Sequence, residues 1–263
     1  MPLYHDQLNR EVNLPVPPKR IISVVPSQTE LLFYLGLDNE IFGITKFCIH
    51  PADKFKSTTK IGGTKQLDID KIKSLKPDLI IANKEENERG QLEELMRHFP
   101  VWISDIHDLP GALDMITGVG ELIGRETAAA TLADTINQNF SKLKPARSAL
   151  RVAYFIWRKP YMVAGPNTFI DSMLQKCGWT NAFDLQRYPE IDADMLRDAR
   201  PDVILLSSEP YPFKEKHLAE LKSLVPSATV KLVDGEMFSW YGSRLLEASD
   251  YFKELLGEIS YDS

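Results

Sequence analysis

The stretch SLKPDLIIA (Ser74–Ala82) decides the fold, because a stretch of the same build, DARPDVILL (Asp198–Leu206), recurs in the other half of the chain. In each copy a charged and apolar run ends at a proline, which disfavours a helical conformation in the residue before it. The Pro-Asp pair then leads into an unbroken aliphatic run, typical of a strand covered on both faces. One copy alone is a common way to enter a parallel strand. Two copies predict two α/β layers, each with a helix, a tight turn and a central parallel strand.

The residues around the two copies alternate between predicted strands and helices, which indicates open, mostly parallel sheets. Ser27 and Glu30 have the spacing of a capping box at the start of the first helix. Strands are expected at Arg20–Val25, Phe42–Phe47, Val101–Ser104, Arg151–Trp157 and Val230–Gly235, and helices at Asn87–His98, Phe169–Lys176, Phe213–Leu224 and Ser243–Leu256.

A long helix is expected between the two series. From Glu126 to Leu143 the chain contains neither proline nor glycine, and Gly124-Arg125 is a plausible break before it. The predicted fold is therefore α/β, with two lobes of mostly parallel sheet flanked by helices and joined by one long backbone helix. The expected boundaries are 19–123 for the N-terminal lobe, 124–146 for the connecting helix and 147–263 for the C-terminal lobe.

Composition excludes several classes of function. The net charge of −6 and the lack of a basic run argue against nucleic-acid binding. No stretch approaches 18 apolar residues, so we expect no membrane-embedded segment. The two cysteines and five scattered histidines have no metal-site spacing, and we expect neither a resident metal nor a cofactor. We expect no catalytic residue: the motif Cys48-Ile49-His50 is a weak signal for a nucleophile or soft ligand.

The candidate binding residues follow the predicted strands, because ligands of open parallel sheets lie beyond the carboxyl ends of the strands. If two such sheets face each other, these residues line a cleft. Aromatic rings are dense among them, which suits a broad and partly apolar ligand. The motif FSWYGSR (Phe238–Arg244) places three rings in what should be a polar loop, and Arg158, Lys159, Arg187 and Arg244 are candidates to meet anionic groups. The predicted ligand-binding residues are Ser27, Gln28, Lys46, Phe47, Trp157, Tyr161, Tyr188, Trp240, Tyr241 and Arg244.

A resemblance to a known family adds to this reading. The segments RIISVVPSQTELLFYLGL, KIGGTKQLDIDKIKSLKPDLIIANKEEN and YPEIDADMLRDARPDVILL, with the long helix, resemble the helical-backbone (class III) periplasmic substrate-binding proteins of ABC importers, of the cobalamin and iron-chelate type. The resemblance covers nearly the whole chain from about Lys19. It implies a non-enzymatic monomer that holds a corrinoid, haem or ferric siderophore between its lobes and delivers it to the permease subunits.

The resemblance also implies roles for particular positions. Cobalamin binders place an aromatic group on each side of the corrin, and the corresponding positions here are Thr64 and Tyr188, of which only the second is aromatic. Family members also present one acid on each lobe to arginines of the permease. The corresponding residues are Asp70 and Asp194, each seven residues before the proline of a repeated stretch. Acids in the first turn of a helix are also favoured by the helix dipole alone.

Two alternatives stay open at this point. One is a cytoplasmic chelate carrier or sensor of the same fold, since the first residues lack the apolar core of a signal peptide, although the resemblance implies a periplasmic or other extracytoplasmic location. The other is an enzyme of the chelatase type.

Overall fold

The computed structural model describes residues 3–14, 17–146 and 148–261. The chain divides into two compact units. Unit 1 comprises Met1–Ile106, Pro110–Thr135 and Tyr241–Arg244, and unit 2 comprises His107–Leu109, Ile136–Trp240 and Leu245–Ser263. The domain boundaries expected from the sequence stay a prediction, and the predicted C-terminal lobe begins and ends on residues that lie outside the described ones.

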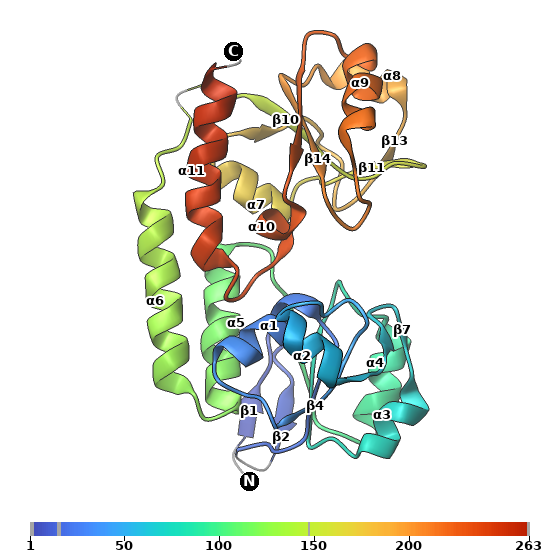
Figure 1. The fold of residues 1–263 in the computed structure, drawn as a ribbon, viewed down its shortest axis with the longest axis vertical. Helices are drawn as coiled ribbons and strands as arrows, with labels where there is room; N and C mark the ends of the chain where they lie inside the picture. The colour runs from blue at the N-terminus through green and yellow to red at the C-terminus, as the bar shows by residue number, and fades with distance from the viewer. Residues whose placement is uncertain (1–2, 15–16, 147, 262–263) are drawn as a thin grey trace. The chain divides into compact units, whose positions relative to one another are not determined.

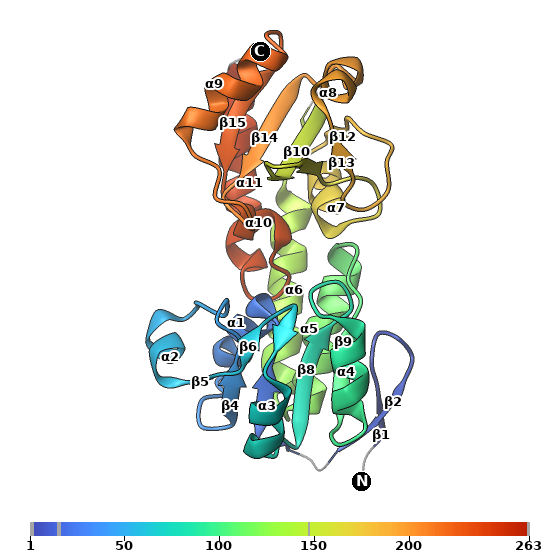
Figure 2. The same cartoon turned by 90° about the vertical axis from the view of Figure 1, so that its right-hand side faces the viewer.

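Unit 1 is built on a five-stranded parallel sheet with the strand order β5-β4-β3-β8-β9 (Figures 1 and 2). Buried aliphatic side chains fill the central strands, and β8 is buried along its whole length. The strands are β3 (Ile21–Ser23), β4 (Ile41–Ile44), β5 (Thr59–Lys60), β8 (Leu79–Asn83) and β9 (Val101–Ser104).

Helices cover both faces of this sheet. Figure 1 shows α3 and α4 on one face and α1 and α5 on the other. Two antiparallel pairs, β1–β2 and β6–β7, complete the unit. These elements are α1 (Pro26–Tyr34), α2 (Ala52–Ser57), α3 (Ile69–Leu75), α4 (Arg89–Met96), α5 (Leu109–Leu122), β1 (Leu3–His5), β2 (Glu11–Asn13), β6 (Gly62–Gly63) and β7 (Gln66–Leu67).

Unit 2 is built on a mixed sheet with the order β13-β11-β10-β14-β15, and β12 pairs with β10. Strands β10, β12, β14 and β15 are parallel, whereas β11 turns back antiparallel to β10. The strands are β10 (Arg151–Trp157), β11 (Tyr161–Val163), β12 (Thr180–Asn181), β13 (Glu190–Ile191), β14 (Val203–Ser207) and β15 (Thr229–Val233).

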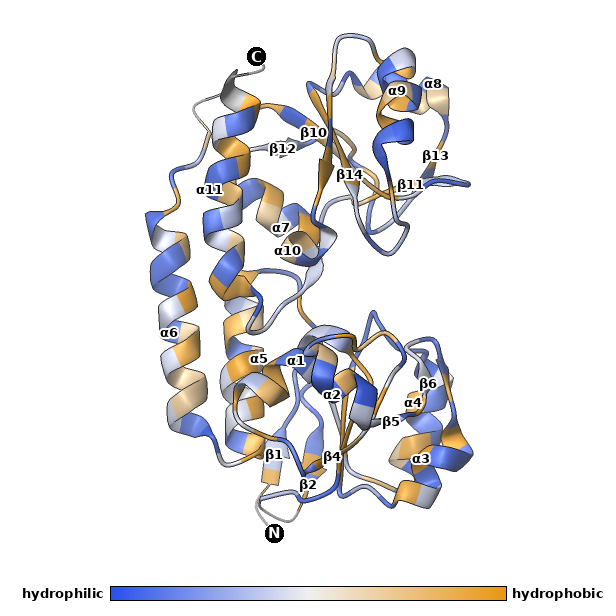
Figure 3. Ribbon diagram, in the orientation of Figure 1, coloured by the Kyte–Doolittle hydropathy of each residue, from blue (hydrophilic) through white to orange (hydrophobic). Residues whose placement is uncertain are grey.

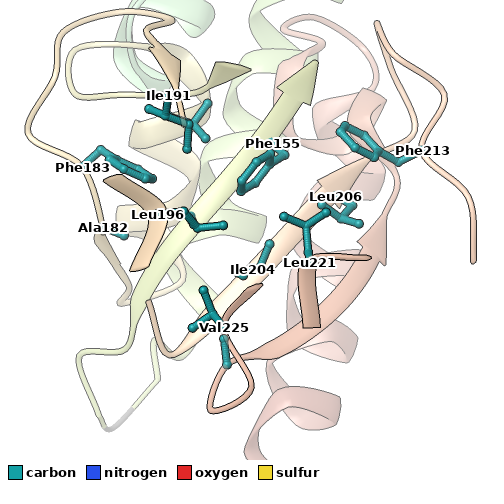
Figure 4. Packing of buried hydrophobic residues seen from close by; sticks show 13 residues of the cluster. Phe155, Ala182, Phe183, Ile191, Leu196, Ile204, Leu206, Phe213, Leu221 and Val225 are labelled. Carbon is teal, nitrogen blue, oxygen red and sulfur yellow. The ribbon is translucent and has the colours of Figure 1, made fainter. Parts of the chain in front are cut away.

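The helices of unit 2 bury an apolar core against that sheet. Figure 4 shows Phe155, Ile204 and Leu206 of the strands packed with Leu196 of α8 and Leu221 of α9. In Figure 1, α8 and α9 lie on one face of the sheet and α7 and α11 on the other. The helices are α7 (Phe169–Lys176), α8 (Ala193–Ala199), α9 (Glu215–Leu224), α10 (Gly235–Ser239) and α11 (Leu245–Tyr261).

The repeated stretch has the same structure in both units, as predicted. Helices α3 and α8 each contain seven residues and begin at an aspartate N-cap, and each ends at a left-handed residue, Lys76 or Arg200, directly before the proline. The Pro-Asp pair then enters β8 or β14, whose residues are all buried. The proline therefore ends the helix and the aliphatic run forms a central parallel strand, in each unit by itself.

Helix α6 (Glu126–Lys142) is the predicted long helix. It begins in unit 1 and ends in unit 2, because the division between the units falls after Thr135. Figure 3 shows hydrophilic and hydrophobic residues alternating along it, and Leu132, Ile136 and Phe140, spaced four apart, are buried. The α/β fold with two mostly parallel sheets flanked by helices and one long linking helix is thus confirmed.

Two local predictions in unit 1 were wrong. Helix α1 begins at Pro26, whose missing N–H suits a first helical position, so its N-cap is Val25 and the Ser27–Glu30 capping box does not form. The expected strand Phe42–Phe47 ends earlier, at Ile44, because the chain turns at Thr45–Cys48.

Candidate functional site

The carboxyl ends of the unit 1 strands meet at one edge of the sheet, which we call the unit 1 strand-end edge. The chain runs from β3 outward to β4 and β5, then returns to β8 on the other side of β3. The strand order therefore reverses at β3 and β8. Such a switch point is where open α/β sheets bind ligands.

A buried amide network fills this switch point. The Asn87 amide nitrogen donates to the carbonyl oxygens of Val24 and Thr64, at 3.1 Å each, and the backbone N–H of Asn83 donates to Asn87 Oδ1 at 2.8 Å. Asn83 Nδ2 donates to Ser104 Oγ at 2.9 Å. The network fixes the turns after β3, β8 and β9 relative to one another, since its members are buried and hydrogen-bonded.

The predicted binding residues Ser27 and Gln28 lie beside this network on α1, and both are buried. Gln28 Nε2 donates to Ser104 Oγ, whereas Gln28 Oε1 has no hydrogen-bond partner among the described residues. Gln28 therefore links α1 to the carboxyl end of β9 through a hydrogen bond. Direct ligand contact by these two residues stays a prediction.

Lys46 and Phe47 follow β4 and are exposed at the unit 1 strand-end edge. The Phe47 side chain is 51% exposed, and the Lys46 ammonium lies 5.1 Å from the centre of its ring. Gly63 packs beneath the ring, where an added Cβ would lie 3.1 Å from Phe47. The ring thus packs against a small residue and is about half exposed.

Arg244, a predicted ligand contact, pairs with a carboxylate within unit 1, and direct ligand contact by this residue stays a prediction. Its guanidinium donates to both carboxylate oxygens of Glu30 on α1, within unit 1, and its side chain is only 13% exposed. A bidentate arginine–carboxylate pair of this kind is among the stronger ionic contacts in proteins. The positive charge of Arg244 is therefore neutralised within the protein.

The carboxyl ends of β10, β14 and β15 form the corresponding unit 2 strand-end edge. Trp157 ends β10 and is 39% exposed. The next residue, Arg158, donates to Glu220 of α9 at 2.7 and 3.1 Å, and the Tyr161 hydroxyl donates to the same carboxylate. Burial raises the pKa of Glu220, but the hydrogen bonds from Arg158 and Tyr161 outweigh it and lower the pKa overall.

Tyr161 is held by the same contact. Burial and the hydrogen bond to Glu220 raise the pKa of Tyr161 to about 12, so its hydroxyl is protonated at neutral pH. The sequence singled out Tyr161 and Arg158, but it gave no signal for Glu220, which lies in the middle of a helix far along the chain.

Three aromatic rings, those of Tyr211, Phe213 and His217, pack together beside Trp157. Its ring lies 5.6 Å from that of Tyr211, which lies 4.8 Å from Phe213, and both of these contact the ring of His217. Edge-to-face packing of this kind stabilises a fixed arrangement of rings. The half-exposed Trp157 therefore rests on a packed aromatic base.

Trp240 is tied to the end of β14. Its indole N–H donates to Glu209 Oε1 at 2.8 Å, and the Ser239 hydroxyl donates to the same oxygen at 2.7 Å. Burial raises the pKa of Glu209 in spite of these two hydrogen bonds. Gly235, at the start of α10, allows this close packing, because an added Cβ would lie 2.3 Å from Ser207 Oγ.

The other predicted rings differ in exposure. Tyr188 is half-buried in the loop before β13, whereas Tyr241 is only 6% exposed. The expectation of a polar loop at Phe238–Arg244 was wrong at its start. Phe238 lies in α10 and is fully buried, with its ring 4.7 Å from Phe252 and 5.0 Å from Tyr154, because the short helix turns it into the core.

The two predicted docking acids occupy equivalent and exposed positions. Asp70 and Asp194 are each the second residue of their helix, two positions after the aspartate N-cap. The Asp194 side chain is 84% exposed and pairs with Arg197 one turn later. A partner protein could reach both acids, and their docking role stays a prediction.

The cysteines and the candidate metal ligands were inspected among the residues that the structure describes. Cys48 and Cys177 are unpaired and buried, and burial raises the pKa of both thiols, that of Cys177 to about 12. Within residues 3–14, 17–146 and 148–261, no three His, Cys, Asp or Glu side chains gather as a metal-binding group. In the same ranges no helix has the length and apolar character needed to cross a membrane.

Comparison with known proteins relates this geometry to a family. The model of the family described as "Periplasmic binding protein" matches residues 21–227. The vitamin B12-binding protein of Pectobacterium carotovorum is 24% identical over 260 residues, covering 92% of this chain and 90% of that protein.

Solved structures share the fold. The periplasmic haem-binding protein of Vibrio cholerae superposes with a TM-score of 0.74 at 20% identity, covering 90% of this chain and 98% of that one. The periplasmic catecholate-siderophore-binding protein of the same organism superposes with a TM-score of 0.76 at 12% identity, covering 99% of each chain.

Proposed function

The chain belongs to the periplasmic binding protein family, and on that premise we propose that it is the substrate-binding protein of an ABC importer whose ligand is a corrinoid or an iron chelate. As a member of a binding-protein family, it is not an enzyme. The proteins it resembles bind vitamin B12, haem or a catecholate siderophore, which are all broad chelates with large flat or apolar surfaces.

The observation that carries the proposal is the placement of two exposed rings. Phe47 and Trp157 are 51% and 39% exposed. Phe47 follows β4 of unit 1, and Trp157 is the last residue of β10 in unit 2. Each rests on a close-packed base, Gly63 or Tyr211. Large rings that are held rigid lose little entropy when they cover a ligand. We assign direct ligand contact to these two rings and to Lys46.

Two of the candidate anion-binding arginines bear on the kind of chelate. Arg158 is paired with Glu220 and Arg244 with Glu30, so both guanidinium groups are already neutralised by carboxylates. Haem and catecholate siderophores carry negative charge that such arginines would meet, whereas the amide-rich corrin of cobalamin does not need them. We therefore expect neither arginine to attract an anionic chelate while its carboxylate partner is in place.

Delivery to a permease is the second part of the proposal. Asp70 and Asp194 are exposed at equivalent positions of two helices with the same cap structure. Carboxylates presented in this way on each unit suit arginines of a membrane partner. The periplasmic location is part of the same proposal, and a cytoplasmic chelate carrier is its competitor; cell fractionation separates the two.

The test is equilibrium binding measured by titration calorimetry with three probes: cyanocobalamin, haemin and a ferric catecholate. We expect at least one of them to bind. Trp157→Ala should then weaken that ligand at least tenfold, equivalent to about 1.4 kcal/mol. Tyr34→Ala is the matched control, because Tyr34 is also exposed (55%) but lies at the end of α1. Absence of binding to all three probes, or equal effects of the two variants, would contradict the proposal.

A further inference from the structure

His217 completes the first turn of α9 with an unusual cap. It is the third residue of the helix, and its Nδ1 accepts a hydrogen bond of 2.9 Å from the backbone N–H of Lys214, the N-cap. In a capping box this acceptor is a glutamate or glutamine. The Lys214 side chain carries only donors, so it cannot supply the other half of the box. The cap at this end of α9 therefore depends on an imidazole that keeps Nδ1 unprotonated.

This hydrogen bond fixes the tautomer of His217. With Nδ1 accepting, the proton of the neutral ring is on Nε2. Among the described residues Nε2 has no hydrogen-bond partner, and the residue is only 2% exposed. The imidazole lies perpendicular to the Phe213 ring, 5.5 Å from it, and tilted against the Tyr211 ring at 5.7 Å.

The same rings connect His217 to the surface. Tyr211 contacts His217 on one side and Trp157 on the other, with ring centres 5.7 and 5.6 Å apart. The backbone N–H of Tyr211 also donates to the carbonyl of Ile156, next to Trp157 in β10. A displacement of the imidazole thus acts on the aromatic base of Trp157 through a single intervening residue.

The surroundings of His217 favour its neutral form. Burial lowers its pKa below the ordinary 6.5, and the positive charges of Arg158, Lys216 and Lys214 lower it further, whereas Glu220 opposes them. Strand β15 and helix α8 both pack against α9. On β15 the ammonium of Lys231 pairs with Glu258. The charged side chains of α8, namely Asp194, Arg197 and Asp198, are all exposed.

We propose that His217 is a positioning residue: in its neutral form it holds the Trp157–Tyr211 face in place, and uptake of a proton at Nδ1 releases that face. The protonated ring would direct an N–H at the N–H of Lys214, so the cap and the cationic ring cannot coexist in this geometry. Release of the cap loosens the start of α9 and the rings that pack on it. The inference rests on the proposed function only for the role of Trp157 as a ligand contact. With that role, the proposal implies that the protein binds its ligand with lower affinity in mild acid than at neutral pH.

The experiment needs no ligand, so its failure is distinct from failure of the proposed function. The full chain is labelled with 5-fluorotryptophan, which gives four fluorine signals, and Trp157→Phe identifies the one from Trp157. In the same pH series, ¹⁵N spectra follow the His217 ring nitrogens and the Lys214 amide. We expect the Nε2-protonated tautomer at pH 7.5, and a shared midpoint below pH 6.5 for His217, Lys214 and Trp157.

Variants separate positioning from a merely structural role. His217→Gln keeps an acceptor at the third helical position but cannot titrate, so the Lys214 amide should keep its neutral shift and the Trp157 signal should lose its pH dependence. His98→Gln is the matched control, because His98 is 47% exposed and lies on another element, and it should leave both titrations unchanged. A Trp157 signal that does not move while His217 titrates, or midpoints that differ, would overturn the proposal even if His217→Gln failed to fold.

Discussion

Asp78 accepts a hydrogen bond of 2.8 Å from the backbone N–H of Arg20, and this contact joins the repeated stretch to the first residue before β3. The Arg20 guanidinium in turn donates to the carbonyl of Leu75 at the end of α3. Unit 2 repeats the arrangement, since Asp202 accepts from the backbone N–H of Arg151 at 2.7 Å and Arg151 donates to Ala199 of α8. The Pro-Asp pair therefore has a structural task in each unit: its acid fixes the start of the neighbouring strand.

We expect Asp78→Ala and Asp202→Ala each to lower the free energy of unfolding by roughly 1–2 kcal/mol, because each removes a charged acceptor from a strand-start N–H. Urea unfolding followed by circular dichroism measures this. The control is Asp134→Ala on the exposed side of α6, which should change the value by less than about 0.5 kcal/mol. Equal stability of all three variants would mean that the Pro-Asp acid has no such role.

Much of the fold was predictable because it depends on local chemistry. Proline at 77 and 201 ends a helix, and the aliphatic run after each Pro-Asp pair forms a buried strand. The ionic contacts at the strand-end edges were not predictable, because they join residues far apart in sequence. Glu220 is 62 residues from Arg158, and Glu30 is 214 residues from Arg244. From the sequence both arginines were candidates to meet anionic groups, because the carboxylates that pair with them lie far away in the chain.

Glu209 should make stability depend on pH. Its pKa in the folded protein is raised above 4.5, mainly by burial, so the folded state favours the protonated acid. The stability that this group contributes is therefore present below about pH 4.5 and is lost as the pH rises through the raised folded value. Glu209→Gln should remove this loss, since glutamine stays neutral and can still accept from Trp240. Melting temperatures from pH 4 to 8 test this, and parallel curves for variant and wild type would refute it.

Release of Arg158 should change ligand preference. Glu220→Gln leaves the guanidinium without its carboxylate, so haemin affinity should rise roughly three- to tenfold while cyanocobalamin affinity stays the same. Glu258→Gln is the control, because it removes the carboxylate that pairs with Lys231 between β15 and α11. Calorimetric titration with both probes provides the comparison. A haemin affinity unaffected by Glu220→Gln would show that Arg158 does not act on the ligand.

The docking acids can be tested against a matched position. The double variant Asp70→Ala and Asp194→Ala should retain ligand affinity and lose most permease-dependent uptake in cells. Asp53→Ala is the control, because Asp53 is also an exposed second residue of a short helix, α2. Uptake by the double variant at the wild-type rate would remove the docking role.

The central claim is that one broad chelate binds to one copy of this chain. Native mass spectrometry of the full chain mixed with equimolar cyanocobalamin, haemin and ferric catecholate tests it most directly. We predict a monomer carrying a single chelate, and loss of that adduct in Trp157→Ala. A spectrum that shows only the unliganded chain at ligand concentrations well above the protein concentration would contradict the claim.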